Sequence, residues 1–238
     1  IDSGVGVDHS ECSIDNSKFT VCTSPIQFTS TNLGDGIHTL LIRSEDKVGN
    51  RGSSPALFNW TVDTLPPTST IDSATDGNKS AVTNAGTTKS TSMTFAFSGN
   101  DTGGIGIAHF VCSTDNSAFV NCTSPFTLPN SLKDGAHTFR VLSQDKVGNR
   151  GSSPALFNWT VDTVPPTTSI KSATDGNKSA VTNSGTTKST SMTFTFSGND
   201  IGGIGIDHFE CSIDDSDFVT CTSPFTLPNS LKDGAHTF

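Results

Sequence analysis

The feature that most constrains the fold is an internal repeat of about 99 residues. Cys12, Cys112 and Cys211 lie 100 and 99 positions apart, and DKVGNRGSSPALFNWTVDT occurs unchanged at residues 46–64 and 145–163. A period of this length is too long for one unit of a helical solenoid and suits a complete small domain. The chain therefore contains about 2.4 copies of one domain.

This period predicts three domains. The first, residues 1–65, lacks its N-terminal part; the second, residues 66–164, is complete; the third, residues 165–238, lacks its last strands. Both ends then fall inside a domain, so we expect a window from a longer array. No apolar run approaches the length of a membrane-spanning helix.

Composition favours an all-β class. Short alternating apolar runs are common, Gly, Pro and Asn punctuate the chain, and no segment keeps a 3.6-residue apolar period. The formal net charge is −9, which argues against nucleic acid because phosphates require a basic surface. Mild acidity admits cations, although it also simply keeps a surface protein soluble.

The complete copy is expected to form seven short strands. Alternation places Met93, Phe95 and Phe97 on one face of a strand. Val111 is expected to point outward, because the equivalent position in the first copy is Glu11. Seven strands in about 100 residues, with frequent turns, predict tandem Ig-like (fibronectin-III-like) β-sandwiches. The expected strands are residues 68–71, 92–97, 109–113, 119–122, 126–128, 136–144 and 155–161.

Each copy also carries two cysteines in a Cys-x9-Cys frame. A turn centred on residues 116–118 would place Cys112 directly opposite Cys122 across a hairpin, close to the separation that a disulfide needs. A buried pair of free thiols is the alternative, and zinc fits poorly because no second ligand pair is near. Disulfides indicate an oxidising, extracellular setting. The predicted bonds are Cys12–Cys22, Cys112–Cys122 and Cys211–Cys221.

Four motifs together, Cys-x9-Cys-TSP, DG-x-HTF, D-x-x-GN and VDT-x-PP, cover the chain. The chain resembles the tandem Ig-like, fibronectin-III-like repeats of bacterial and archaeal surface or extracellular proteins. This resemblance implies a structural role in rigid stalks, adhesins, envelope components or extracellular fibres. It does not imply a common ligand, because fold does not determine function.

Histidines are the most obvious candidates for catalysis, and we expect none to be catalytic. His38, His137 and His236 repeat at the start of the strand where sandwich domains often carry a corner-bonding Tyr, and the chain has no Tyr. A neutral His can donate the same type of hydrogen bond. The Gly-rich TGGIGI leads into a strand, so it lacks the helix N-terminus that a phosphate site needs. The sequence therefore predicts no enzyme.

Glycosylation is a further expectation. Asn59 and Asn158 belong to Asn-x-Thr sequons that point outward on a strand, and Asn78 and Asn177 belong to sequons in a polar loop. These four positions could carry glycans if the source organism modifies Asn.

The joints between domains could bind calcium. In this topology VDTLPP brings Asp63 near Asn100, Asp101, Asp145 and Asn149, which offer the oxygen ligands that Ca²⁺ takes. The paired prolines also stiffen the linker. The alternative is that Asp and Asn occur here only because they favour turns. The second joint would bring together Asp162, Asn199 and Asp200 in the same way. The fold itself requires no cofactor.

Two functions remain open. The first is a structural extracellular array, whose partners are neighbouring copies of the repeat, including self-association into fibres. The second is a carbohydrate- or protein-binding module that acts through its loops. The first is favoured because both Trp residues alternate inward and most Phe residues lie on core faces. The complete open reading frame would show which anchor or tip flanks the array.

Overall fold

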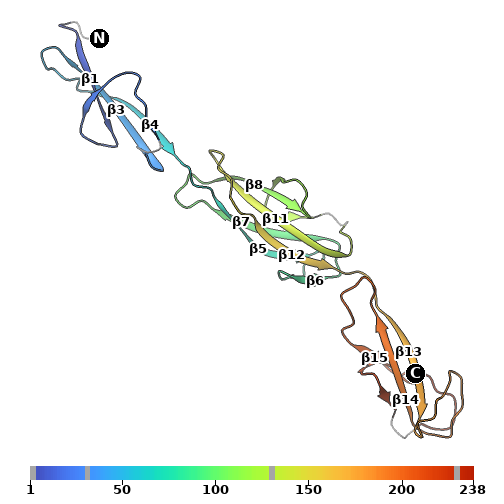
Figure 1. The fold of residues 1–238 in the computed structure, drawn as a ribbon. Helices are drawn as coiled ribbons and strands as arrows, with labels where there is room; N and C mark the ends of the chain where they lie inside the picture. Colours follow the sequence, from blue (N-terminus) through green and yellow to red (C-terminus); the bar gives the residue numbers. More distant parts are fainter. Residues whose placement is uncertain (1–3, 30–32, 129–131, 228–230) are drawn as a thin grey trace. The chain divides into compact units, whose positions relative to one another are not determined.

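The computed structural model describes residues 4–29, 33–128, 132–227 and 231–238 (Figure 1). All regular elements within these ranges are β-strands. No helix in the described residues is long and apolar enough to cross a membrane. The strands are β1 (Val7–Ile14), β2 (Thr20–Cys22), β3 (Gly36–Asp46), β4 (Ala56–Val62), β5 (Thr68–Asp76), β6 (Gly86–Thr88), β7 (Met93–Asn100), β8 (Ile107–Thr114), β9 (Val120–Cys122), β10 (Phe126–Thr127), β11 (Gly135–Asp145), β12 (Ala155–Val161), β13 (Thr167–Asp175), β14 (Met192–Asn199), β15 (Phe209–Cys211), β16 (Val219–Cys221) and β17 (Phe225–Thr226).

Backbone pairing arranges these strands in five sheets. The first copy has one sheet, in the order β2-β1-β3-β4. The complete copy has two, β10-β7-β5 and β6-β12-β11-β8-β9, which correspond to the two layers of an Ig-like sandwich. The third copy has β13-β14-β17 and β15-β16. The predicted fold class is confirmed.

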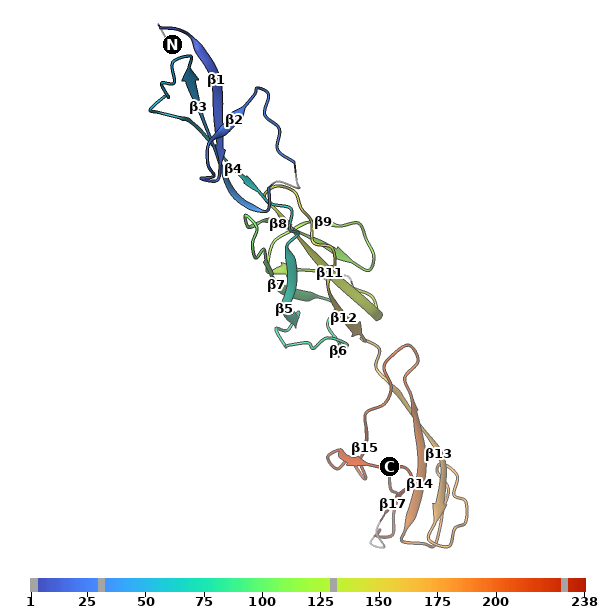
Figure 2. The ribbon, with the colours of Figure 1, turned by 60° about the vertical axis from the view of Figure 1, so that its left-hand side comes forward.

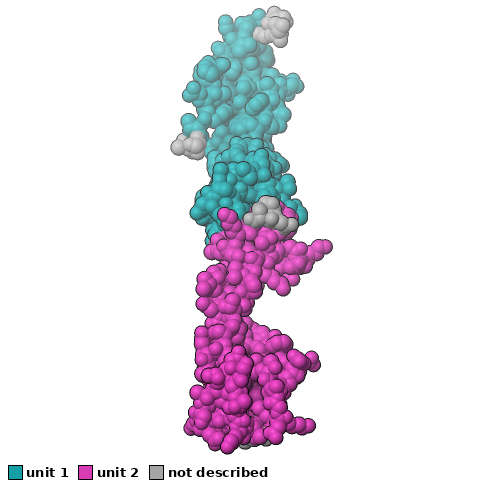
Figure 3. Space-filling model, turned by 90° about the vertical axis from the view of Figure 1, so that its right-hand side faces the viewer, with its two compact units in different colours: residues 1–74, 95–126, 138–157 teal, residues 75–94, 127–137, 158–238 magenta. Residues whose placement is uncertain are grey.

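The chain divides into two compact units (Figure 3). The first consists of residues 1–74, 95–126 and 138–157, and the second of residues 75–94, 127–137 and 158–238. The middle copy contributes residues to both units. Each unit is described by itself.

Aromatic stacking forms the core of each unit. In the first unit Phe95 stacks on Phe139 with ring centroids 4.2 Å apart, and Phe157 meets Phe95 edge-on. In the second unit Phe194 stacks on Phe238 at 4.1 Å. These two residues are the repeat equivalents of Phe95 and Phe139. The same alternation therefore builds the same aromatic contact in two copies.

Strand β6 was missed by the sequence analysis, which expected no strand between residues 71 and 92. It runs parallel to β12, with Gly86 opposite Trp159. Its residues, Gly-Thr-Thr, carry no alternating apolar signal. The adjacent loop is fastened by the backbone of Asn158, whose carbonyl accepts from the amide of Ala85 and whose amide donates to Oδ1 of Asn84.

The three disulfides are present, one in each copy of the cysteine frame. The expected hairpin register was wrong, however. Cys112 lies opposite Val120, and Cys122 lies opposite Phe110, so each bond joins diagonal neighbours (β2 and β9 in Figure 2). The Cα atoms of Cys112 and Cys122 are 5.8 Å apart, within the usual range for a disulfide.

The turn accounts for part of this register. By itself it would pair Cys112 with Phe119, and one extra residue before β9 moves the pairing to Val120. Asp115 and Asn116 both adopt positive φ, 49° and 61°, and the amide of Ser117 donates to the carbonyl of Thr114. This is the pattern of a type I′ turn, which Asp and Asn tolerate at small cost. The turn therefore lies at Asp-Asn rather than being centred on the residues that follow.

The side chains of β1 and β8 that were expected to point outward are less exposed than the alternation predicted. Val111 is 9% exposed and lies opposite Leu142. Glu11, 7% exposed, lies opposite Arg43, whose Nε donates to it at 2.8 Å. The same cross-strand position thus holds an apolar pair in one copy and an ion pair in another.

Candidate functional site

The joint between the first and second copies is fastened to the first copy by Asp35. The backbone amide and the hydroxyl group of Thr64 both donate to the Asp35 carboxylate, at 2.6 and 3.1 Å. Asp134 binds Thr163 in the same way at the second joint, at 2.7 and 3.0 Å. Each VDT motif is therefore anchored to the domain that precedes it. The sequence analysis did not identify this role of the repeated Asp-Gly motif.

The neighbouring Asp63 fastens the same linker to the second copy. Its Oδ2 accepts from the backbone amide of Ile105 at 3.0 Å. Its backbone carbonyl accepts from the side-chain amide of Asn149 at 2.9 Å. The Asp63 residue is only 9% exposed. Asp63 and Thr64 together thus bind both domains that they join.

Three carboxylates converge at this joint. Asp63 follows β4, Asp101 follows β7 and Asp145 ends β11. One carboxylate oxygen from each lies within 4.8 Å of the others. The three strand ends meet because the linker and the loops that follow β7 and β11 share one end of the sandwich. This is the arrangement that the sequence predicted for these three residues.

Neutral amides surround the Asp145 carboxylate. Oδ1 accepts from the backbone amides of Val147, Gly148 and Asn149, and Oδ2 accepts from the Asn149 side chain at 2.7 Å. Burial of this 2%-exposed residue opposes ionisation. The hydrogen bonds outweigh that effect and hold the pKa of Asp145 below its ordinary value. Asp145 is therefore charged at neutral pH.

Asp101 is less completely satisfied. Its Oδ2 accepts from the backbone amide of Gly106 at 2.7 Å. Its Oδ1 is shielded from solvent and has no hydrogen-bond partner. Asn100, in contrast, is engaged with Thr102, whose hydroxyl donates to the Asn100 amide oxygen. The structure therefore groups Asp101, but not the Asn100 side chain, with the other carboxylates.

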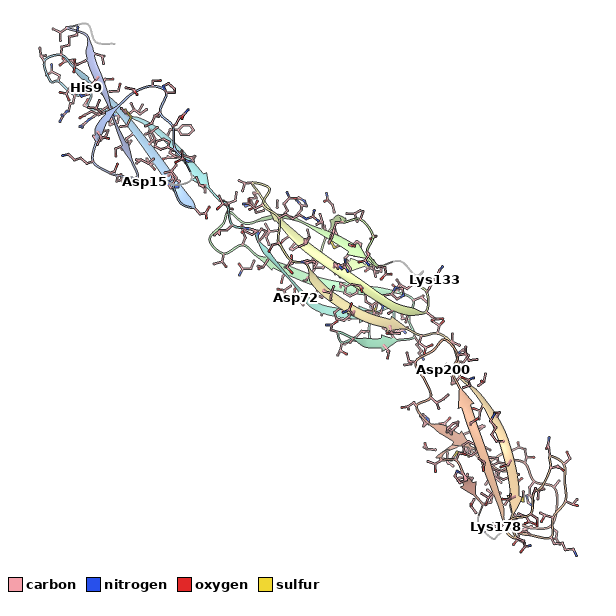
Figure 4. All side chains as sticks on the ribbon, viewed as in Figure 1. His9, Asp15, Asp72, Lys133, Lys178 and Asp200 are labelled. Carbon is pink, nitrogen blue, oxygen red and sulfur yellow. A yellow bond between two sulfur atoms is a disulfide. The ribbon has the colours of Figure 1, made fainter. Side chains whose placement is uncertain are left out.

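The second joint repeats part of this geometry. Asp162 Oδ2 accepts from the amide of Ile204 at 2.8 Å, and Asp200 Oδ2 accepts from the amide of Gly205. Asp200 Oδ1 is again buried without a partner. Figure 4 labels Asp200 in the loop that follows β14. The backbone carbonyl of Asn199 accepts from the hydroxyl of Thr167.

The corner histidines bond as the sequence predicted, and His38 has an acceptor on each ring nitrogen. His38 Nε2 lies 2.8 Å from the carbonyl oxygen of Gly34, and Nδ1 lies 2.7 Å from the carboxylate of Asp15. Both partners are hydrogen-bond acceptors, so this geometry favours the doubly protonated, positively charged ring. The hydrogen bond to Asp15, then the one to Gly34, raises the pKa of His38.

His236 follows the same pattern, and His137 shares its carbonyl contact. His236 Nε2 faces the carbonyl of Lys232 and Nδ1 faces Asp214, both at 2.7 Å. His137 Nε2 faces the carbonyl of Lys133 at 2.7 Å. For His38 and His236, both ring nitrogens are engaged, which leaves neither free to act as a general base in this geometry.

A second ionisable cluster was not recognised from the sequence. His9, Glu11 and Glu45 bring ligand atoms within 4.8 Å of one another. Arg51 already pairs with Glu45 at 2.7 Å, and Arg43 pairs with Glu11. These arginines neutralise both glutamates, so the cluster is an ion-pair network rather than a metal site.

The four sequons differ in accessibility. Asn59, Asn78 and Asn177 are exposed, whereas Asn158 is half-buried beside the loop that precedes β6. Asn59 Oδ1 also accepts from the hydroxyl of Thr39 at 2.9 Å.

These features define a class: tandem Ig-like sandwiches, each with a hairpin disulfide, joined by hydrogen-bonded linkers. The family model of the bacterial Ig-like domain (group 3) matches residues 23–94 and 120–197. The chain belongs to this family.

Two solved structures resemble the chain. The first is a tetra-tandem repeat in the extending region of a large adhesion protein, with 13% identity, a TM-score of 0.27 and coverage of 96% of this chain and 60% of that chain. The second is Bacteroides ovatus SGBP-B of a mixed-linkage glucan utilization locus, in complex with a mixed-linkage heptasaccharide. It shows 15% identity, a TM-score of 0.18 and coverage of 83% and 56%. Both TM-scores are too low to bear on function. No match was found among curated proteins.

Proposed function

We propose that this chain is part of a structural extracellular array, a stalk, adhesin shaft or surface fibre, in which the joints limit bending between domains. One observation carries the proposal: the same hydrogen bonds recur at both joints. Thr64 binds Asp35 at the first joint, and Thr163 binds Asp134 at the second. A linker fastened on both sides, with two prolines after it, has little freedom to bend.

An extracellular location supports this role. Three disulfides account for all six cysteines, and such bonds persist in oxidising compartments. The bacterial Ig-like family is consistent with the same location. Neighbouring copies of the repeat are the proposed partners, including self-association into fibres.

Carbohydrate binding is less favoured. Glycan sites commonly present exposed aromatic rings beside polar groups, whereas Trp159 is 1% exposed. In the described part of the middle copy, every Phe and Trp side chain is buried or half-buried. A non-catalytic role is likewise proposed, because the repeated histidines serve the fold.

The test is small-angle X-ray scattering of the 238-residue protein and of Asp35→Ala. The variant removes both acceptors of Thr64 and should broaden the distribution of interatomic distances by loosening the first joint. Asp233→Ala is the matched control, because Asp233 occupies the same repeat position with no following linker in this chain.

The control should scatter like the parent protein. A parent protein that already bends freely would contradict the rigid array, and so would an Asp35→Ala profile that matches the parent. Circular dichroism of each variant establishes that its domains remain folded.

A further inference from the structure

We propose that the β5 edge of one molecule pairs with the β13 edge of a second copy of this chain, with Asp72 of the first molecule beside Lys171 of the second. This surface deepens the proposed self-association into fibres by naming the strands that meet. The inference rests on that part of the proposed function and not on the stiffness of the joints. Association between molecules and bending within one molecule are measured separately.

The edge strands of the middle copy differ in length. In the described part of this copy the two sheets end on β5, β6, β9 and β10. Three of these strands have two or three residues, whereas β5 has nine. A short edge strand offers few backbone groups to another chain, but a long one is a template for a further strand. The repeat equivalent of β5 is β13, which also has nine residues and lies at an edge of its sheet.

Both strands carry a charged residue at the same repeat position. In β13 the pairing with β14 shifts register between Ile170 and Ser172, so Lys171 lies in a β-bulge. A bulge with a charged side chain is a common means of keeping sheet edges apart. The equivalent residue of β5 is Asp72. Such a charge opposes pairing only with an edge of the same sign, so it disfavours β5 beside β5 and β13 beside β13.

The reversal of sign between the two edges selects the partner. The sequence of β5 is TSTIDSATD and that of β13 is TTSIKSATD, so the other differences are exchanges of Ser and Thr. Charge is therefore the property in which the two edges differ, and it makes them complementary. Opposite charges on adjacent strands stabilise a sheet, and like charges directly opposite each other destabilise it. An edge of one kind thus accepts an edge of the other kind.

Both charged side chains are accessible to a neighbouring molecule. Asp72 and Lys171 are exposed, and residues 167–172 of β13 are exposed throughout. The hydroxyl of Ser98 on β7 donates to Oδ1 of Asp72 at 2.9 Å (Asp72 is labelled in Figure 4). Ser98 is exposed and follows the buried Phe97, so this hydrogen bond holds the carboxylate on the outer face of the sheet. A strand added beside β5 would bring its own outward side chains next to this carboxylate.

Sedimentation velocity of the 238-residue protein across a range of concentrations tests the pairing. The parent should associate with rising concentration. Lys171→Asp places like charges together and should weaken association about tenfold, as should Asp72→Lys. The double variant with both substitutions restores opposite signs and leaves the net charge at −9, so association should recover. Lys178→Asp is the matched control, because it makes the same charge change in the exposed turn after β13 and should leave association unchanged.

Hydrogen–deuterium exchange gives an independent measure of the backbone pairing. Amides in residues 68–72 and 167–171 should exchange more slowly in the associated protein than in the monomer. A parent protein that stays monomeric would overturn the proposal, even if its joints are stiff and the structural array stands. Equal weakening by Lys178→Asp, or a double variant that does not associate, would also overturn it. Association without protection of either edge would show that other surfaces meet and would exclude the strand pairing.

Discussion

His38 is the residue whose role in the structure differs most from the role that the sequence predicted. It lies 7% exposed, with a carboxylate on one ring nitrogen and a carbonyl on the other. Its ring also lies 5.6 Å from that of Trp60. The imidazolium thereby ties the turn at Asp15, which follows β1, to the start of β3. A corner residue that would be neutral as Tyr is here one half of an ion pair.

This pair predicts a defined pH dependence. The pKa of His38 is raised above 6.5, so its contribution to stability is complete below pH 6.5 and is lost as pH rises through the raised value. The pKa of Asp15 is lowered from 3.8, chiefly by its hydrogen bond to His38, so its contribution is present above pH 3.8 and is lost as pH falls through the lowered value. The pair should stabilise the first copy most between these limits.

The measurement is the melting temperature of the parent and of His38→Gln from pH 4 to pH 9, monitored by Trp60 fluorescence in a Trp159→Phe background. The difference between the two proteins should be largest near pH 5–6 and should shrink at alkaline pH. Nuclear magnetic resonance of the imidazole should give a pKa above 6.5 for His38 and for His236. Titration of His38 at or below 6.5 would contradict the ion-pair interpretation.

At the scale of elements, the hairpin of β8 and β9 shows how one turn sets a register. The Cys-x9-Cys spacing was sufficient to predict the partners, because ten positions separate two residues that one hairpin must bring together. It was not sufficient to predict which residues lie directly opposite. That depended on the turn at Asp115 and Asn116, which both adopt positive φ, and on one extra residue before β9. Side-chain spacing carries no information about either feature.

Removal of the hairpin disulfide should destabilise the middle copy. The double substitution Cys112→Ser, Cys122→Ser opens the loop that this disulfide closes, whose ends are ten positions apart. In the chain-entropy model the free energy of unfolding should fall by about 3 kcal/mol. Denaturant titration in a Trp60→Phe background isolates the signal of Trp159, which is 1% exposed. Replacing Cys12 and Cys22 instead should leave that transition in place. An unchanged midpoint in the Cys112/Cys122 variant would show that packing alone holds the hairpin.

At the scale of the whole molecule, accessibility ranks the four predicted sequons. If the source organism glycosylates Asn, modification should appear on the exposed Asn59, Asn78 and Asn177 before Asn158, whose backbone amide is bound by Asn84. Peptide mapping of native material by mass spectrometry measures the occupancy of each site. Asn158 occupied while the other three are bare would contradict the ranking, and four unmodified peptides would remove glycosylation from the account.

The domain boundaries at residues 65 and 164 remain predictions of the repeat period. They place each VDT motif at the end of one domain, where its Thr is bound by the Asp of that domain's own Asp-Gly motif. Its Asp, in contrast, binds an amide of the following copy. The motif therefore belongs physically to both domains. This sharing is the reason to seek the function of the chain at its joints.

The sequence by itself determined the repeat, the all-β class, the core face formed by Met93, Phe95 and Phe97, and the cysteine partners. Each of these follows from period or alternation along the chain, which local chemistry imposes on any fold that the sequence adopts. Topology reasoning also brought Asp63, Asp101 and Asp145 to one joint. The tertiary structure decided the hairpin register, the short strand β6, the carboxylate partner of His38 and the hydrogen bonds between Thr64 and Asp35. Those features depend on the sign of a backbone dihedral, or on which acceptor meets which donor after distant segments pack, and neither leaves a periodic trace in sequence.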